Sequence, residues 1–390
     1  MQPIILVFCD YYLPGYKAGG PVRSISQLVR ALGKEFSFKV VTRDRDLGDN
    51  DAYRNIKTNA LQITGDAKVI YLAPETVTLV NLRRLIHSQE HQLVYLNSLL
   101  SPRFTMSILL LRRLKLIPKV PVILAPRGEL AREALRLKWV AKRCYLTVGK
   151  LLGLFDGLFW HASSSHEADD IRREFGQKAV IKEAPPIPNI DTGSASGGFV
   201  KRSHQKSSTL KVVFLSRVSR MKNLDGALRI LQAVRGRLQF DIYGTCEDRH
   251  YWNECEALVC ALPPNVNAQF KGAVRSNDVK EVLSKYDLFF LPTKGENYGH
   301  VIVEALSVGC PVLISDRTPW RGLESKNVGW EFPLNNSAAF VNTIERLIKM
   351  PPEGFCLIAQ SIHNFVQLEI GNGRSLERNR DLFQNALSSA

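Results

Sequence analysis

The sequence predicts an α/β protein made of two Rossmann-like domains, each with a doubly wound parallel sheet. Short apolar, β-branched runs alternate with amphipathic helical stretches, and a segment rich in Gly, Ser and Lys interrupts this alternation at residues 191–208. The 390 residues suffice for two domains, and 45% hydrophobic with 23% charged residues is typical of globular proteins. We therefore place the first domain at 1–190, a linker at 191–208 and the second domain at 209–364.

The first domain should contain six strands with helices between them. The strands are expected at 4–8, 38–42, 69–72, 93–96, 120–124 and 158–161. The first helix should begin at Pro21, a residue favoured in the first turn, and end at Gly33. Ser164 and Glu167 have the spacing of a capping box, which predicts a helix over 168–175.

The second domain should contain strands at 211–215, 240–243, 266–270, 288–291 and 311–314. Arg217 and Lys222 follow the first of these strands and precede an amphipathic helix. Arg217 offers a planar fork of donors and Lys222 a mobile charge, a pair suited to a diphosphate. Either cation alone would indicate an ordinary basic loop.

Two carboxylates flank the helix start after the strand 288–291. Glu296 should lie in the loop at the carboxyl end of this strand, the edge where open parallel sheets bind ligands, and Glu304 about two turns further along. Glu304 can reach a hydroxylated group such as a ribose. Backbone N–H groups at the helix start should point at a phosphate, namely those of Asn297, Tyr298, Gly299 and His300. The alternative is a solvated helix with two surface acids.

These residues together resemble the retaining glycosyltransferases of family 4, which have the two-domain GT-B architecture with a cleft between the domains. The resemblance rests on the Glu296–Glu304 spacing, the Arg217–Lys222 pair, and motifs at 14–24, 125–130, 187–189 and 305–312. It implies that Glu304 holds the donor ribose, that Glu296 contacts the transferred sugar, and that Arg217 and Lys222 bind the diphosphate. It also implies that a last helix, at about 365–390, returns to the first domain.

The resemblance extends to further site residues. Gly244, Ala273 and Val274 would contact the donor, whereas Gly19, Gly20 and Arg23 would contact the acceptor or the donor phosphate; a tight turn alone would also explain the two glycines. Arg127 stands where many relatives have a His near the reacting carbon. Because arginine does not act as a base at neutral pH, its role among the catalytic residues would be electrostatic.

The function implied is transfer of a sugar from a UDP- or GDP-sugar to a hydroxyl of a glycan acceptor, with retention and without a metal or other cofactor. Such an enzyme would act in surface polysaccharide biosynthesis on a lipid-linked acceptor. The alternative is a non-catalytic nucleotide-sugar-binding protein on the same fold, which Arg127 favours.

The net charge of +15 is concentrated in one region. Residues 103–150 contain twelve Lys or Arg and two acids, and Arg136, Arg143 and Lys150 are spaced seven apart, with Lys138 and Lys142 beside them. A basic amphipathic stretch suits an anionic membrane surface, although its apolar face could instead pack in the core. No nucleic-acid motif accompanies the charge, so nucleic acid is not expected as a partner.

We expect a cytoplasmic protein, with or without peripheral attachment to the cytoplasmic face of the inner membrane, because the sequence shows no apolar run of 18 residues and no signal peptide at its start. The seven cysteines lack metal-site spacing and are expected to be reduced thiols.

Overall fold

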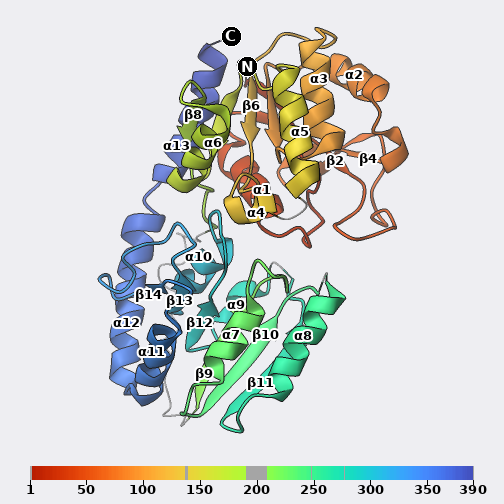
Figure 1. The fold of residues 1–390 in the computed structure, drawn as a ribbon. Helices are drawn as coiled ribbons and strands as arrows, with labels where there is room; N and C mark the ends of the chain where they lie inside the picture. Colours follow the sequence, from red (N-terminus) through yellow and green to blue (C-terminus); the bar gives the residue numbers. More distant parts are fainter. Residues whose placement is uncertain (1, 137–138, 190–208, 247, 276, 390) are drawn as a thin grey trace. The chain divides into compact units, whose positions relative to one another are not determined.

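The computed structural model describes residues 2–136, 139–189, 209–246, 248–275 and 277–389 and divides the chain into two compact units (Figure 1). The first unit comprises Met1–Ile187 and Gly373–Ala390, and the second comprises Pro188–Asn372. The division falls close to the predicted 190, and the return to the first unit comes at Gly373 rather than at about 365. The predicted linker at 191–208 lies outside the described residues.

The first unit has an eight-stranded sheet in the order β3-β4-β2-β1-β5-β6-β7-β8, parallel throughout except for the β3–β4 pair. The six predicted strands are all present, displaced by at most two residues. The strands are β1 (Ile4–Phe8), β2 (Ser37–Arg43), β3 (Leu61–Thr64), β4 (Ala67–Leu72), β5 (Leu93–Asn97), β6 (Val122–Ala125), β7 (Phe159–Ala162) and β8 (Val180–Glu183). Sequence reasoning missed β3 and β8 because these edge strands are half exposed and lack an apolar run.

Seven α-helices, a 3₁₀ turn and a π turn accompany this sheet among the described residues. They are α1 (Gly20–Leu32), η1 (Pro74–Thr76), α2 (Leu79–Ser88), η2 (Pro102–Met106), α3 (Ser107–Arg113), α4 (Arg132–Arg136), α5 (Trp139–Leu151), α6 (Ser165–Phe175) and α13 (Arg374–Ser388). The helix α13 lies beside α6 and β8 (Figure 1). It docks on the unit through Phe383, whose ring lies 5.6 Å from that of Phe36 and 5.3 Å from that of Tyr95, and through Arg380, which pairs with Glu35 at 2.6 Å.

Two predicted helix boundaries need correction. The helix α1 begins at Gly20, so that Pro21 is its second residue, and Gly33 ends it with a right-handed φ of −62°. The helix α6 begins at Ser165 rather than at 168, because the Ser164 hydroxyl caps it by accepting the Glu167 N–H. The Glu167 carboxylate reaches back past the start of the helix and accepts the N–H of Ser163 at 2.7 Å.

The helix α5 exposes the apolar residues that could have packed in the core. It buries Leu146 and Gly149, whereas Leu151 is 82% exposed and Trp139 62% exposed. We call the exposed apolar side chains of α5 and of Leu152, which follows it, the α5 stripe: Trp139, Val140, Cys144, Val148, Leu151 and Leu152. The alternative prediction, that this apolar face packs in the core, is therefore wrong for these residues.

The second unit has a six-stranded parallel sheet in the order β11-β10-β9-β12-β13-β14. Its strands are β9 (Leu210–Leu215), β10 (Leu238–Tyr243), β11 (Val266–Gly272), β12 (Leu288–Leu291), β13 (Val312–Ser315) and β14 (Gly329–Phe332). All five predicted strands are present, and β14 was missed because Gly329–Phe332 is not an apolar run. The chain winds outward from β9 in one direction and from β12 in the other, so β9 and β12 border the point where the strand order reverses.

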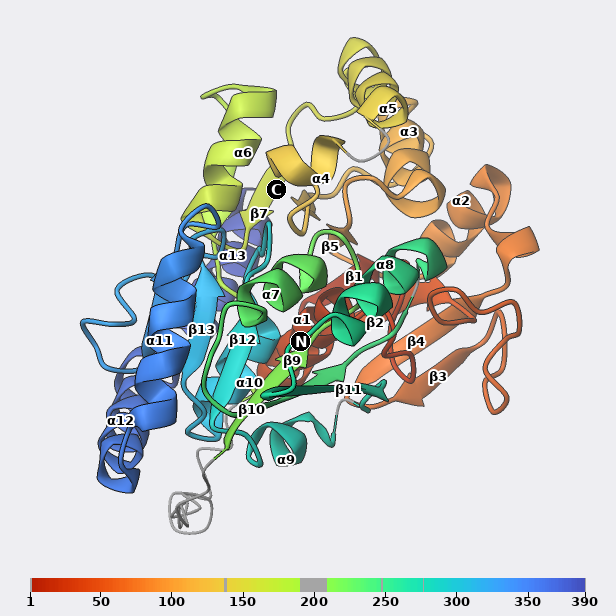
Figure 2. The same cartoon turned by 60° about the horizontal axis from the view of Figure 1, so that its bottom comes forward.

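Helices flank this second sheet, with α7 and α8 side by side (Figure 2). They are α7 (Leu224–Leu231), α8 (Arg249–Cys260), α9 (Val279–Leu283), α10 (His300–Ser307), α11 (Ser337–Lys349) and α12 (Pro352–Phe365), followed by the π turn η4 (Val366–Ile370). The seven cysteines are unpaired thiols. Of the helices described, none combines the length and the apolar character needed to cross a membrane.

Candidate functional site

The two loops at the strand-order reversal of the second sheet are fastened to each other. One loop joins β9 to α7 and the other joins β12 to α10. The Met221 carbonyl accepts the Lys294 N–H at 2.8 Å and the Thr293 hydroxyl at 3.0 Å, and the Asn223 side-chain amide donates to the Pro292 carbonyl at 2.8 Å. All three bonds end on backbone carbonyls, so they fix the backbones of the two loops relative to each other. The loops therefore hold a defined position at the edge where Rossmann-like sheets bind ligands.

The predicted residues Lys222 and Glu296 meet across these loops. The Lys222 Nζ lies 2.5 Å from the Glu296 Oε2, and the two side chains are only 12% and 17% exposed. Arg217 lies in the same loop as Lys222 and is exposed. The loops after β9 and β12 thus bring together a cation, Lys222, and a carboxylate, Glu296. Arg217 adds a second cation that solvent or a ligand can reach.

The start of α10 differs from the prediction. The helix begins at His300 after Gly299, whose φ of 81° is left-handed, so that Asn297, Tyr298 and Gly299 form the preceding turn and only His300 belongs to the first helical turn. Tyr298 is buried, and its carbonyl accepts the Trp320 indole N–H at 2.6 Å. Its side chain therefore serves packing. Glu304 lies further along α10 and is partly buried.

Gly244 allows two backbone segments to touch. A Cβ at this position would lie 1.9 Å from the Ser216 carbonyl oxygen, so only glycine lets the end of β10 approach the β9–α7 loop. The Gly244 N–H also donates to the Gly272 carbonyl at 2.9 Å. Ala273 and Val274 follow directly at the carboxyl end of β11. Gly244 therefore has a structural reason independent of its predicted donor contact.

In the first unit, Arg127 lies beyond the carboxyl end of β6 with a left-handed φ of 57°. Its guanidinium donates to the Asn97 side-chain carbonyl through Nε at 3.1 Å and Nη2 at 2.9 Å, to the Tyr95 hydroxyl at 2.6 Å, and to the Ser163 hydroxyl at 3.3 Å. The buried Glu167 carboxylate accepts the N–H of Gly128 at 2.5 Å and so holds the same turn. Arg127 is thus fixed at the sheet edge by its side chain and by its backbone.

The loop containing Gly19 and Gly20 is held by the segment that follows β2. The Asp46 carboxylate accepts the N–H groups of Tyr16 at 2.7 Å and Lys17 at 3.0 Å. Gly19 has a φ of 70° with no atom within 4 Å of a Cβ built there, and Gly20 is the first residue of α1. The Arg23 N–H donates to the Gly19 carbonyl at 3.3 Å. The conformation of Gly19 explains the glycine, and its contact with a ligand stays a prediction.

Sequence reasoning missed a partly buried acid at the same edge of the first sheet. The Glu129 carboxylate accepts from the Ser98 hydroxyl at 2.7 Å and the Leu100 N–H at 2.8 Å. Burial raises the pKa of Glu129 to about 7 and also raises the pKa of Asp10, which follows β1. Glu129 stands in the 125–130 motif, but nothing in its local pattern indicates burial.

His161 is structural rather than a ligand-facing residue. It is buried, its Nδ1 lies 2.7 Å from the Tyr95 hydroxyl, and its Nε2 lies 2.7 Å from the Ala184 carbonyl. Burial, together with the nearby charge of Arg127, lowers the pKa of His161 to about 3.

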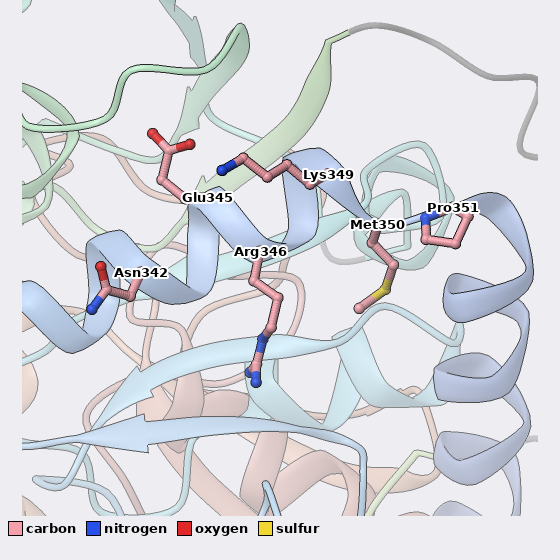
Figure 3. Close-up of a pocket in the computed structure, with 6 residues that line it drawn as sticks. All are labelled: Asn342, Glu345, Arg346, Lys349, Met350 and Pro351. Atoms are coloured by element: carbon pink, nitrogen blue, oxygen red, sulfur yellow. The ribbon is translucent and has the colours of Figure 1, made fainter.

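A surface hollow of about 570 Å³ lies along α11 and contains none of the predicted site residues (Figure 3). Its lining includes Arg346, which pairs with Glu324 at 3.3 Å, and Glu345, which accepts the Arg235 N–H at 2.6 Å. Two of its charged groups, Glu345 and Arg346, are therefore engaged in structural contacts.

A family model and a curated relative each match part of the chain. Residues 199–357 match the family "Glycosyl transferases group 1". A curated relative, the phosphatidyl-myo-inositol mannosyltransferase of Mycobacterium leprae (strain TN), is 26% identical over 211 residues. This match covers 51% of the chain and only 54% of the relative.

Solved structures resemble the whole chain. Anabaena HepE in complex with UDP and glucose has a TM-score of 0.73 at 15% identity, and the sucrose-phosphate synthase of Thermosynechococcus elongatus has 0.73 at 17%, each with complete coverage of both chains. WaaG, a glycosyltransferase of lipopolysaccharide biosynthesis, has 0.70 at 12% identity, with 97% of this chain and 99% of WaaG covered. The protein therefore has the GT-B fold, and its residues 199–357 match the group 1 glycosyltransferase model.

Proposed function

We propose that this protein is a retaining glycosyltransferase of family 4 that moves a sugar from a nucleoside diphosphate-sugar to a hydroxyl of a glycan acceptor. The observation that carries the proposal is the Lys222–Glu296 pair at the strand-order reversal of the second sheet. A cation for phosphate and a carboxylate for sugar hydroxyls lie within one hydrogen bond of each other there.

In the proposed mechanism the protein stabilises the leaving group. Negative charge builds on the diphosphate as the glycosidic bond breaks, and Arg217 and Lys222 would offset it from fixed positions. Glu296 would bind hydroxyls of the transferred sugar, and Glu304 those of the ribose. This division of roles leaves no carboxylate pair of the hydrolase type, in which two acids flank one bond. Because protein cations fill this role, the reaction should proceed without a metal.

The comparisons favour particular substrates. Anabaena HepE is described with UDP and with UDP-glucose, and the Mycobacterium leprae relative is named for transfer of mannose to a phosphatidyl-inositol. We accordingly propose UDP or GDP as the donor nucleotide, a lipid-linked glycan as the acceptor, and surface polysaccharide biosynthesis as the process. Acceptor binding would fall to the first unit.

A lipid-linked acceptor calls for a membrane-facing surface, and the α5 stripe suits one. Six exposed apolar side chains within residues 139–152 are unusual on a water-soluble surface. The basic residues contribute less than predicted, because Arg143 and Lys150 both pair with Glu174, at 3.2 and 2.6 Å, and Lys142 donates to the Ala134 carbonyl. Lys138 lies outside the described residues. The apolar side chains thus become the main support for attachment to the cytoplasmic face of an anionic membrane.

A panel of UDP- and GDP-sugars tests the proposal. Incubation with each donor and with extracted lipid-linked glycans should release nucleoside diphosphate for one donor, and a chelator should leave the rate nearly unchanged. The alternative is a nucleotide-sugar-binding protein without turnover, for which calorimetry would show donor binding and no diphosphate release. Strict dependence on a divalent ion would contradict the mechanism.

A further inference from the structure

We propose that Tyr95 and His161 are positioning residues that hold the Arg127 guanidinium as a preorganised cation for a phosphate oxygen of the substrate. The inference rests on the proposed function and assigns two buried residues to it. Its starting point is the hydrogen-bond chain Arg127–Tyr95–His161–Ala184 in the first unit.

The partners of Arg127 orient its charge without neutralising it. Four of its five N–H groups donate to an amide oxygen and two hydroxyl oxygens, on Asn97, Tyr95 and Ser163. Within the described part of the chain no carboxylate pairs with it, and one N–H on Nη1 has no partner. A fixed, partly buried cation with a donor to spare is suited to an anionic oxygen.

The hydrogen-bond donors and acceptors in the series Arg127–Tyr95–His161–Ala184 can be assigned in only one way. The Ala184 carbonyl can only accept, so the Nε2 of His161 donates to it. Neutral His161 then accepts at Nδ1, which requires the Tyr95 hydroxyl to donate its proton there. The Tyr95 oxygen is left as an acceptor, and it receives the N–H from the Nη2 of Arg127.

Burial keeps this arrangement in one state. Tyr95 and His161 are almost completely buried, so no water competes for their bonds. The groups that face them are Arg127, Glu167 and Cys9, and the pKa of Cys9 is itself raised by burial. A protonated His161 would carry donors on both nitrogens, so the Tyr95 oxygen would face the donors of His161 and Arg127 at once and the Tyr95 proton would lose its acceptor. The lowered pKa of His161 prevents this at neutral pH.

A double-mutant cycle on the full chain separates positioning from simple structural support. Tyr95→Phe keeps the ring and removes both hydroxyl bonds. In the parent background it should lower kcat/KM at least about tenfold, since it removes a hydrogen bond to a charged group. In an Arg127→Ala background the same change should alter kcat/KM by less than about twofold, because the group it positions is gone. The loss of Tm should be similar in both backgrounds.

Two further variants sharpen the test. His161→Gln, which retains one donor and one acceptor, should keep more activity than His161→Phe. Tyr286→Phe is the matched control: it removes another buried hydroxyl, which donates to Asp241 at 2.7 Å, and should lower Tm without lowering kcat/KM. The substrate that supplies the oxygen is identified by calorimetry: weaker binding of bare nucleoside diphosphate by Arg127→Ala indicates the donor, and a raised acceptor KM alone indicates an acceptor phosphate.

The outcomes that would overturn the inference are distinct. Equal losses of kcat/KM from Tyr95→Phe in both backgrounds would make Tyr95 a structural residue only. Full activity of Arg127→Ala, with Arg217→Ala inactive, would remove Arg127 from the reaction and leave the proposed function standing. A parent protein inactive with every donor would overturn the proposed function itself.

Discussion

The Lys222 ammonium and the Glu296 carboxylate form an ion pair of 2.5 Å that joins the loops after β9 and β12. Because these strands flank the strand-order reversal, the pair lies at the centre of the sheet edge rather than on a peripheral surface. An incoming diphosphate would have to share Lys222 with Glu296. The pair therefore links phosphate recognition to the carboxylate proposed for the sugar.

The first prediction concerns the cations of the β9–α7 loop. Arg217→Ala and Lys222→Ala should each lower kcat by about a hundredfold or more, because each removes charge that stabilises the leaving diphosphate. Arg220→Ala is the matched control, since Arg220 lies in the same loop but pairs with Glu254 at 2.6 Å, and it should retain kcat. Steady-state assays check this, and unchanged kcat in both test variants would remove the diphosphate assignment.

The second prediction separates the two acids. Glu304→Gln should weaken binding of the bare nucleoside diphosphate, because it loses charge-assisted bonds to the ribose. Glu296→Gln should bind the bare diphosphate at least as tightly as the parent, since it releases Lys222 from its ion pair, and should weaken only the sugar-bearing donor. Calorimetry with both ligands measures this. Parent-like binding of the diphosphate by Glu304→Gln would show that Glu304 does not hold the ribose.

The third prediction tests the close approach at Gly244. Gly244→Ala should destabilise the protein by about 1–3 kcal/mol or more, because its Cβ would collide with the Ser216 carbonyl. It should also lower donor affinity by shifting the β9–α7 loop. Gly373→Ala, where no atom lies within 4 Å of the new Cβ, should cost only the strain of its left-handed conformation, about 1–2 kcal/mol. Urea unfolding compares the two, and equal losses would contradict the collision.

The strands and loops could be predicted, and the contacts between residues distant in sequence could not. Apolar runs located β9 and β12, and the basic and acidic loops follow from their ends. The pairing of Lys222 with Glu296 depends on the strand order, which local patterns do not encode. The exposed apolar face of α5 was ambiguous for the same reason, because periodicity identifies a face but not what covers it. The edge strands β3 and β8 lack the buried run that marks a strand.

The fourth prediction concerns pH. Folded His161 has a pKa of about 3 against an ordinary 6.5, so only the unfolded chain takes up this proton and stability should fall as pH drops below about 6.5. Folded Glu129 has a pKa of about 7 against 4.5, so it contributes in the opposite direction and stability should fall as pH rises from about 4.5 to 7. The free energy of unfolding should be measured with urea at several pH values between about 4.5 and 7. As the pH falls through this range, His161→Gln should lose less stability than the parent, and Glu129→Gln should lose more. The same slope in all three proteins would contradict the burial of these groups.

The last prediction concerns the α5 stripe. Val148→Ser and Leu151→Ser together should abolish or strongly reduce co-sedimentation with phosphatidylglycerol vesicles, because both side chains are at least half exposed and would enter the lipid interface. Folding should be unaffected, since neither residue packs in the core.

Leu368→Ser is the matched control: Leu368 is 73% exposed in η4 of the second unit, and its loss should not change sedimentation. Neutral vesicles should bind the parent more weakly, as the remaining basic residues favour anionic lipid by about 1 kcal/mol each. Transfer to a soluble acceptor analogue should survive in the double variant. Unchanged sedimentation of the double variant would show that the stripe does not contact the membrane.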